Sequence, residues 1–303
     1  MINKREWFYL ILVILSAGIL MAGFTQIDLE FAQSVYHYER WMDWVLRLSM
    51  IPAVVCAWVF SMQLTAYAFI DRLLGKGPAK SPVIYMIVGF LSAIGIPVYA
   101  FWTVMRYFGM VNDSVGWVML FVVEVFAIAG AIRLAKERER SARSRQASRA
   151  MTGLLTFYFC LLAGVVISYF RQRVSLSVMV SVGSFEYYTP WYKASESELL
   201  RQLAQDSLPL GSFPAMTVAV AGLSTISSYL LDGTHRSWRN ALAVLSYLYT
   251  VFIQVLAVIS GRAFPTDALA GGLLAGLCAI IGAVLFRLIR RDAFGSLYEV
   301  EKV

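Results

Sequence analysis

The sequence predicts an all-α polytopic membrane protein of about eight transmembrane helices, and three observations support this fold class. Of the 303 residues, 59% are hydrophobic and only 15% are charged, and the mean hydropathy is +0.66. The apolar residues form blocks of about 20, the length that crosses the hydrocarbon core of a bilayer. The blocks show no alternation of apolar and polar residues, so helices are the spanning element that can satisfy the backbone inside each segment.

The predicted spans can be placed in order along the chain, with short charged or Gly/Pro-containing segments between them. Lys and Arg collect on the cytoplasmic side of membranes. Placing both termini in the cytoplasm puts the basic residues between 133 and 149 on that side. The formal charge of +7 therefore indicates membrane orientation and not a nucleic-acid partner. The predicted spans are 7–24, 48–70, 83–105, 116–134, 151–170, 214–231, 241–259 and 268–289.

Two segments on the outer side are long enough to hold structure of their own. The first span follows Lys4 and Arg5 and has no small-residue cleavage site after it, so it is interpreted as a retained anchor. After it, apolar residues recur at helical spacing in 25–47, which predicts a helix lying in the interface. These residues are Phe31, Val35, Tyr38, Met42 and Val45.

The second outer segment, 171–213, is predicted to be a small extracytoplasmic cap. It starts with apolar residues that alternate mostly with serine, which predicts a strand over 174–182. Aromatic residues follow in 185–192, and Ser195 with Glu198 then forms a capping box that opens a short helix ending before Pro209.

The predicted domains are 1–149, with an extra hairpin and a basic cytoplasmic loop, 150–292, a helical core with the cap, and 293–303, a cytoplasmic tail. The three cysteines lie in separate apolar blocks, so no disulfide framework, metal site or cofactor is predicted. Glu124 lies near the middle of a span, where a carboxylate is costly and is either functional or paired.

Three stretches carry a family resemblance, and the most informative runs from Gly261 to Gly272 at the outer start of the last span. The second is 211–217, with Pro214, and the third is 171–174. In order, spacing and membrane side, residues 150–290 resemble the type 2 phosphatidic acid phosphatases. The resemblance implies a core bundle of six helices, so two of the eight predicted spans form an additional hairpin. The range of the family also implies a bacterial inner membrane.

The family's chemistry is missing at the matching positions. Its members transfer a phosphoryl group through a nucleophilic His, a second His as general acid and base, and cationic groups on the phosphate. Arg173 and Asp267 match the pattern, and a gapped alignment also lets Ser260 and Arg262 serve as the family's Ser-Arg pair. The positions that depart from the pattern hold Val166, Val174, Ala215, Met216, Thr217, Ala257 and Ala263.

Neither histidine of the chain is an evident replacement. His235 falls in a predicted cytoplasmic loop, and His37 lies in the first outer segment, where it is interpreted as interfacial or solvated. Asp267 orients the catalytic His in the resembling family. Here it is predicted to cap the last helix, and the alternative is that it accepts a hydrogen bond from Arg262. The candidate ligand-binding residues are Arg171, Arg173 and Arg262, which form a phosphate or carboxylate pocket in one interpretation and reach the interface as isolated side chains in the other.

Three functions remain open from the sequence. The first is a degenerate lipid-phosphatase-like protein that binds a lipid-phosphate or glycolipid headgroup at its outer face, in envelope lipid or glycan transport or assembly. The second is a structural or regulatory subunit of a membrane complex whose protein partner contacts residues 173–192. The third is a divergent lipid phosphate phosphohydrolase, which predicts phosphate release by the purified protein.

Overall fold

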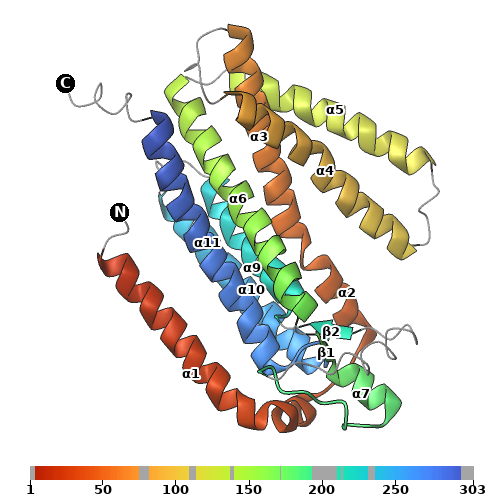
Figure 1. Cartoon of the computed structure of the whole chain (residues 1–303). Coiled ribbons are helices and arrows are strands. Elements are labelled where there is room, and N and C mark those ends of the chain that lie inside the picture. Colours follow the sequence, from red (N-terminus) through yellow and green to blue (C-terminus); the bar gives the residue numbers. More distant parts are fainter. Residues whose placement is uncertain are drawn as a thin grey trace. The chain divides into compact units, whose positions relative to one another are not determined.

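Helices make up most of the computed structural model, which describes residues 4–74, 82–108, 114–136, 140–170, 172–192, 210–212, 214–230 and 236–294 (Figure 1). The eight apolar segments predicted from the sequence are helical where they are described, except at Ser49–Met50 and at Pro214–Ala215. The elements in chain order are α1 (Lys4–Val35), α2 (Arg40–Leu48), α3 (Ile51–Leu74), α4 (Pro82–Phe108), α5 (Ser114–Lys136), α6 (Arg140–Phe170), β1 (Gln172–Val174), α7 (Leu176–Val182), β2 (Leu210–Ser212), α9 (Met216–Gly222), the 3₁₀ helix η1 (Leu223–Leu230), α10 (Arg236–Ile259) and α11 (Pro265–Phe294).

Four helical stretches in the described part of the chain are long and apolar enough to cross a membrane. They are Arg40–Ile70, which comprises α2 and most of α3, Arg149–Ile167, Asn240–Ile259 and Pro265–Gly282. Two shorter apolar stretches, Met86–Phe101 and Met216–Ser227, accompany them. The chain is therefore a helical membrane protein, as the composition predicts.

The chain forms two compact units, neither of which is a continuous segment. Unit 1 contains Met1–Ala53, Phe157–Thr225 and Asn240–Ile281, and unit 2 contains Val54–Thr156, Ile226–Arg239 and Gly282–Val303. The boundary predicted at 149/150 falls inside α6. The candidate site lies entirely in unit 1.

In unit 1, small residues of α11 let neighbouring helices approach closely. A Cβ atom on Gly271 would meet the backbone of Ala215, and one on Gly272 would meet the amide of Gln254 in α10. The Nε2 of Gln254 donates a hydrogen bond of 3.2 Å to the carbonyl of Ala268. The sequence predicts a small face formed by Gly272 and Gly276, but a Cβ on Gly276 would meet nothing within 4 Å. In this part of α11 the close packing therefore occurs at Gly271 and Gly272, and not at Gly276.

A tight turn, Ser260–Phe264, connects α10 to α11 and is called the α10–α11 junction below. Gly261 has a φ of 69°, in the left-handed region that glycine adopts without steric cost. The backbone N–H groups of Arg262 and Ala263 both donate to the carbonyl of Ala257, and the carbonyl of Gly261 accepts from Ser177 of α7 at 3.0 Å. The turn thus ends α10 and also anchors the start of α7.

Replacing Gly261 with alanine should therefore destabilise unit 1. The new Cβ would lie 2.7 Å from the ring of Tyr36 and 3.0 Å from the backbone nitrogen of Ser177, at a φ that L residues rarely adopt. The expected loss is about 1–2 kcal/mol, measured as a lower midpoint of thermal unfolding in detergent. Gly276→Ala, at an open helical position, is the matched control and should leave the midpoint unchanged or raise it.

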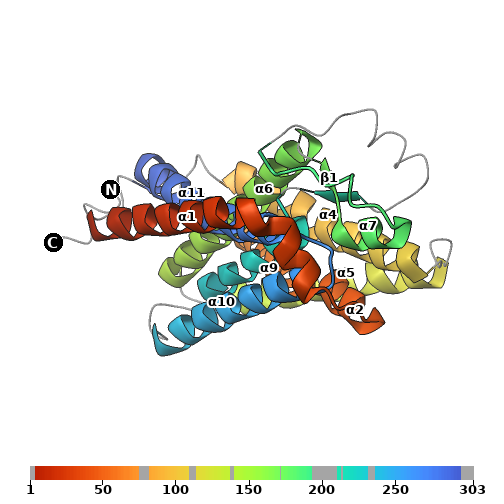
Figure 2. The ribbon, with the colours of Figure 1, turned by 90° about the horizontal axis from the view of Figure 1, so that it is seen from below.

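The first outer segment is not one interfacial helix, so this prediction is wrong. Instead, α1 continues to Val35, an extended link follows, and α2 starts at Arg40. The break coincides with a contact to the α10–α11 junction, where the backbone N–H of His37 donates 2.9 Å to the carbonyl of Ile259. Seen from below, α1 passes across the start of α11 before the chain turns into α2 (Figure 2).

The predicted strand over 174–182 is also wrong, because strand structure stops at Val174. The following residues form α7, which buries Leu176, Val178 and Met179 and leaves the later valines exposed. Gly183 ends the helix with a φ of 74°, the left-handed conformation common at helix C-termini. β1 pairs in antiparallel register with β2, so its partner strand comes from the same chain.

Two other expectations concern polar segments. The basic loop expected over 136–149 is helical from Arg140 onward, and Ala147 is buried within it. Arg, Gln and Ala favour helices, so propensity explains this correction. The capping box at Ser195 and Glu198 lies outside the described residues.

Candidate functional site

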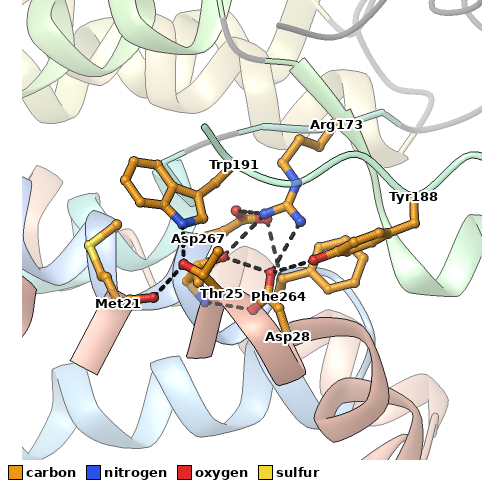
Figure 3. A network of polar contacts seen from close by, with 9 residues as sticks. Met21, Thr25, Asp28, Arg173, Tyr188, Trp191, Phe264 and Asp267 are labelled. Atoms are coloured by element: carbon orange, nitrogen blue, oxygen red, sulfur yellow. Dashed lines mark hydrogen bonds and ion pairs between the residues drawn. The ribbon is translucent and has the colours of Figure 1, made fainter. Parts of the chain in front are cut away.

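Arg173 is the centre of a buried polar network at the start of α11 (Figure 3). β1 carries Arg173, and its side chain is only 3% exposed. One terminal nitrogen forms an ion pair with Asp267 and lies 3.2 Å from the hydroxyl of Thr266. The other terminal nitrogen lies 3.1 Å from Asp28 Oδ2. Asp28, Arg173, Tyr188, Thr266 and Asp267 are called the Arg173 network below.

Asp28 and Asp267 together cap the N-terminus of α11. The backbone N–H of Phe264, at the N-cap position, donates to Asp267 Oδ2 at 3.3 Å. The carboxylate of Asp28 in α1 accepts two hydrogen bonds from Thr266. The backbone N–H of Thr266 donates to Oδ1 at 3.1 Å, and its hydroxyl donates to Oδ2 at 2.8 Å. Phe264 has no side-chain oxygen, so these carboxylates satisfy N–H groups that a helix leaves unpaired. The predicted capping role of Asp267 is confirmed.

Aromatic side chains cover the guanidinium of Arg173. Its carbon lies 4.4 Å from the ring centroid of Phe264 and 5.4 Å from that of Tyr188, and the two rings meet edge to face. Trp191 donates from its indole nitrogen to the hydroxyl of Thr25 at 2.7 Å, which ties the segment after α7 to α1 (Figure 3). Stacking on aromatic faces adds a cation–π attraction to the ion pairs.

The electrostatics of this network favour internal pairing. Burial on its own would lower the pKa of Arg173, but Asp267 and Asp28 raise it above its ordinary value. Burial, with the negative charge of Asp28, raises the pKa of Tyr188 to about 12. Arg173 therefore stays charged and Tyr188 stays neutral at physiological pH. One guanidinium between two carboxylates gives these three side chains a formal charge of −1.

Arg262, by contrast, belongs to a second cluster. It lies in the α10–α11 junction and binds Asp43 of α2 through two hydrogen bonds of 2.9 and 2.6 Å. The hydrogen bond to Asp43 raises the pKa of Arg262, and Tyr38 donates to the same carboxylate at 2.9 Å. The side chain of Arg262 is 32% exposed. Arg173 and Arg262 thus have separate carboxylate partners, and Arg171 lies outside the described residues.

The other motif positions hold small or apolar side chains. Ala263 and Ala215 are buried, and Thr217 and Met216 are half-buried at the start of α9. The backbone N–H of Ala215 donates 3.0 Å to the carbonyl of Asp267, which holds the two motif segments together. Pro214 is buried beside Ala215. Ser260 is buried, and its hydroxyl donates to the carbonyl of Ala257.

His37 is closer to the α10–α11 junction than the sequence indicates. Its backbone contacts Ile259, but its imidazole is 69% exposed and pairs with Glu39 at 3.0 Å. That pairing lowers the pKa of Glu39. His235 lies outside the described residues. Within the described chain, no group of three or more His, Cys, Asp or Glu side chains is arranged to hold a metal ion.

Glu124 belongs to unit 2, whereas the Arg173 network and the pair of Arg262 with Asp43 belong to unit 1. It is buried in α5, and the indole nitrogen of Trp58 in α3 donates to Glu124 Oε2 at 3.4 Å. Among the described residues, Oε1 of Glu124 has no hydrogen-bond partner. Trp58 is therefore the partner that the sequence leaves unnamed.

Sequence reasoning missed Asp28 and Asp43, which pair with the two candidate arginines. Asp28 lies within α1, shortly after the apolar run that ends at Phe24, and a carboxylate at that place in an apolar helix is a usable signal for a buried pair. Comparison of the chain with models of known protein families, with curated proteins and with solved structures finds no match.

Proposed function

We propose that this protein is a non-catalytic, phosphatase-like membrane protein that binds the phosphate-bearing headgroup of a lipid or glycolipid near the α10–α11 junction. Such binding serves transport or assembly of envelope lipids or glycans. The proposal includes eight spans, which rest on the apolar blocks, and cytoplasmic termini, which rest on the distribution of basic residues. It also includes an inner membrane. A likeness to the type 2 phosphatidic acid phosphatases is part of the same proposal.

The Arg173 network is the observation that supports a role without phosphoryl transfer. In the resembling family, the matching arginine and aspartate serve the phosphate and a catalytic His, whereas Arg173 and Asp267 here pair with each other. Ala263 holds the position of the nucleophile and is buried. Phosphoryl transfer by that mechanism needs an imidazole beside the phosphate, and the imidazole of His37 is instead directed toward Glu39.

Arg262 supports headgroup binding, because it keeps an exposed portion beside exposed aromatic residues. Tyr38 and Trp41, which lie in and after the link between α1 and α2, are 44% and 48% exposed. A guanidinium offers five donors in a planar fork, so Arg262 can donate to a phosphate while it stays bonded to Asp43. Interfacial tyrosine and tryptophan side chains suit the headgroup level of a bilayer.

The proposal predicts binding of phosphatidic acid without phosphate release. Purified protein in detergent, incubated with phosphatidic acid or a polyprenyl phosphate, should release no free phosphate above a mock purification, while an active lipid phosphatase serves as the positive control. Lipid that is retained through size-exclusion chromatography, and counted by mass spectrometry, should include the phosphorylated lipid.

Release at a catalytic rate would contradict the proposal and favour a divergent phosphohydrolase. In that case His37→Asn should abolish the release if His37 supplies the missing imidazole. A purified protein that retains no phosphorylated lipid but carries a stoichiometric protein partner would instead favour a structural or regulatory subunit.

A further inference from the structure

Among the described residues of unit 1, α2 together with the α10–α11 junction carries a second group of arginines besides the Arg173 network. On α2, Arg40, Asp43 and Arg47 are spaced i, i+3 and i+7, which places them on one helix face. Arg262 binds Asp43 from the junction. Arg40, Asp43, Arg47 and Arg262 are called the α2 arginine cluster below.

The arginines of the α2 arginine cluster interact with the hydrogen-bonded pair formed by Tyr38 and Asp43. Arg262 and Arg40 both act electrostatically on the hydroxyl of Tyr38, which donates to Asp43. Arg47 also interacts electrostatically with Asp43. Both helix-borne arginines are exposed. A ligand can therefore approach these two arginines on the exposed face of α2.

Charge distinguishes the two clusters. Three arginines, with the carboxylates of Asp43 and of nearby Glu39, have a formal sum of +1, against −1 for Arg173 with Asp28 and Asp267. Arg173 is also buried and covered by aromatic rings. An anion is attracted by the first arrangement and repelled by the second. The α2 arginine cluster is thus the better phosphate site in the described part of unit 1.

The remaining faces of α2 indicate a lipid and not a free ion. Met42 and Leu46 are buried in a core cluster with residues of α9, α10 and α11, which fixes α2 to unit 1. Beside the arginine face, Trp41, Trp44 and Leu48 are spaced i, i+3 and i+7, and they are 48%, 40% and 49% exposed. An exposed aromatic and apolar face next to a basic face suits the boundary between headgroups and acyl chains.

The first part of α2 lies at the level of the α10–α11 junction, where Asp43 binds Arg262. The end of α2 lies further along α10, where the hydroxyl of Tyr249 donates to the carbonyl of Ser49 at 2.9 Å. The junction joins the end of α10 to the start of α11, and both belong to stretches long enough to span a membrane. The arginine at the start of α2 therefore lies beside the ends of two apolar stretches.

We propose that the α2 arginine cluster binds the headgroup phosphate of an anionic phospholipid, with Arg40 and Arg47 donating to the phosphate and the tryptophans of α2 lying against the glycerol and upper acyl chain. This proposal rests on the proposed function and assigns its binding site. Arg262 positions the cluster by holding Asp43 between the two arginines of the helix.

The test compares phosphatidylglycerol binding by full-length wild-type protein and by the Arg40→Gln/Arg47→Gln double variant. Each protein is titrated with phosphatidylglycerol in detergent, and bound lipid is counted by native mass spectrometry. Affinity should fall about fivefold for each arginine removed, which corresponds to about 1 kcal/mol per basic residue near an anionic headgroup. Both arginines are exposed, so the thermal midpoint should be unchanged.

Arg133→Gln, at an exposed arginine near the end of α5, is the matched control and should bind as the wild type does. Unchanged binding by the double variant overturns the site but leaves the proposed function intact, whereas wild-type protein that binds no anionic lipid overturns both. Addition of inorganic phosphate separates the ligand sources. Lipid binding that resists phosphate supports the proposal, and displacement by phosphate alone overturns the assignment to a lipid.

Discussion

Replacing Arg173 with methionine should lower the stability of the protein more than any other single substitution in the described part of unit 1. Methionine fills much of the same volume but leaves Asp28 and Asp267 buried without their shared cation. Removing one partner of a buried ion pair typically costs about 3–5 kcal/mol. We expect the variant to be recovered in low yield and to unfold at a clearly lower temperature in detergent.

A compensating variant separates charge from packing in this experiment. Asp28→Asn/Arg173→Met/Asp267→Asn removes all three charges together and should recover part of the lost stability, because neutral side chains cost less to bury than unpaired carboxylates. Arg133→Met, at an exposed arginine, controls for the loss of a positive charge. An unfolding midpoint for Arg173→Met equal to that of the wild type would contradict the structural role of the Arg173 network.

Asp28→Ala should have the second largest effect. The substitution removes the acceptor for the backbone N–H of Thr266 and one of the two carboxylates on Arg173. Since Arg173 keeps Asp267, the expected loss is about 2–3 kcal/mol, measured by thermal or denaturant unfolding. Asp28→Asn, which keeps an acceptor for Thr266, should lose less.

Glu30 is the matched control for this prediction, because it is an exposed acid two residues away on the same helix. Glu30→Ala should leave the unfolding midpoint within the error of the measurement. A double-mutant cycle between Asp28 and Arg173 should give a coupling free energy of about 0.5–3 kcal/mol. Purely additive losses would show that the two side chains act independently, contrary to their 3.1 Å contact.

The helices were predictable because hydropathy and length are properties of one continuous segment of the sequence. Each of the eight apolar segments is helical over most of its described residues, and Asp267 caps α11 as its place at the helix start predicts. The break before α2 was not predictable in this way. No glycine or proline marks residues 36–39, and the contact of His37 with Ile259 depends on tertiary structure.

The site was predictable only in part, for a related reason. Family-like spacing identified Arg173, Arg262 and Asp267, but it could not identify their partners. Asp28 is separated from Arg173 by 145 positions, and Arg262 is separated from Asp43 by 219. Neither separation leaves a periodic signal in the sequence. The charge of Arg173 is neutralised by two buried carboxylates. Arg262 instead binds Asp43, which lies on a helix with two exposed arginines.

The long separation between Asp28 and α11 has a consequence for biosynthesis. The ribosome adds Arg173, which pairs with Asp28, 145 positions after Asp28, and Thr266 follows 238 positions after Asp28. Until α11 is inserted, α1 therefore carries a carboxylate that lacks its backbone donor at the start of α11. The contact between α1 and α11 can form only after the segments between them have been synthesised.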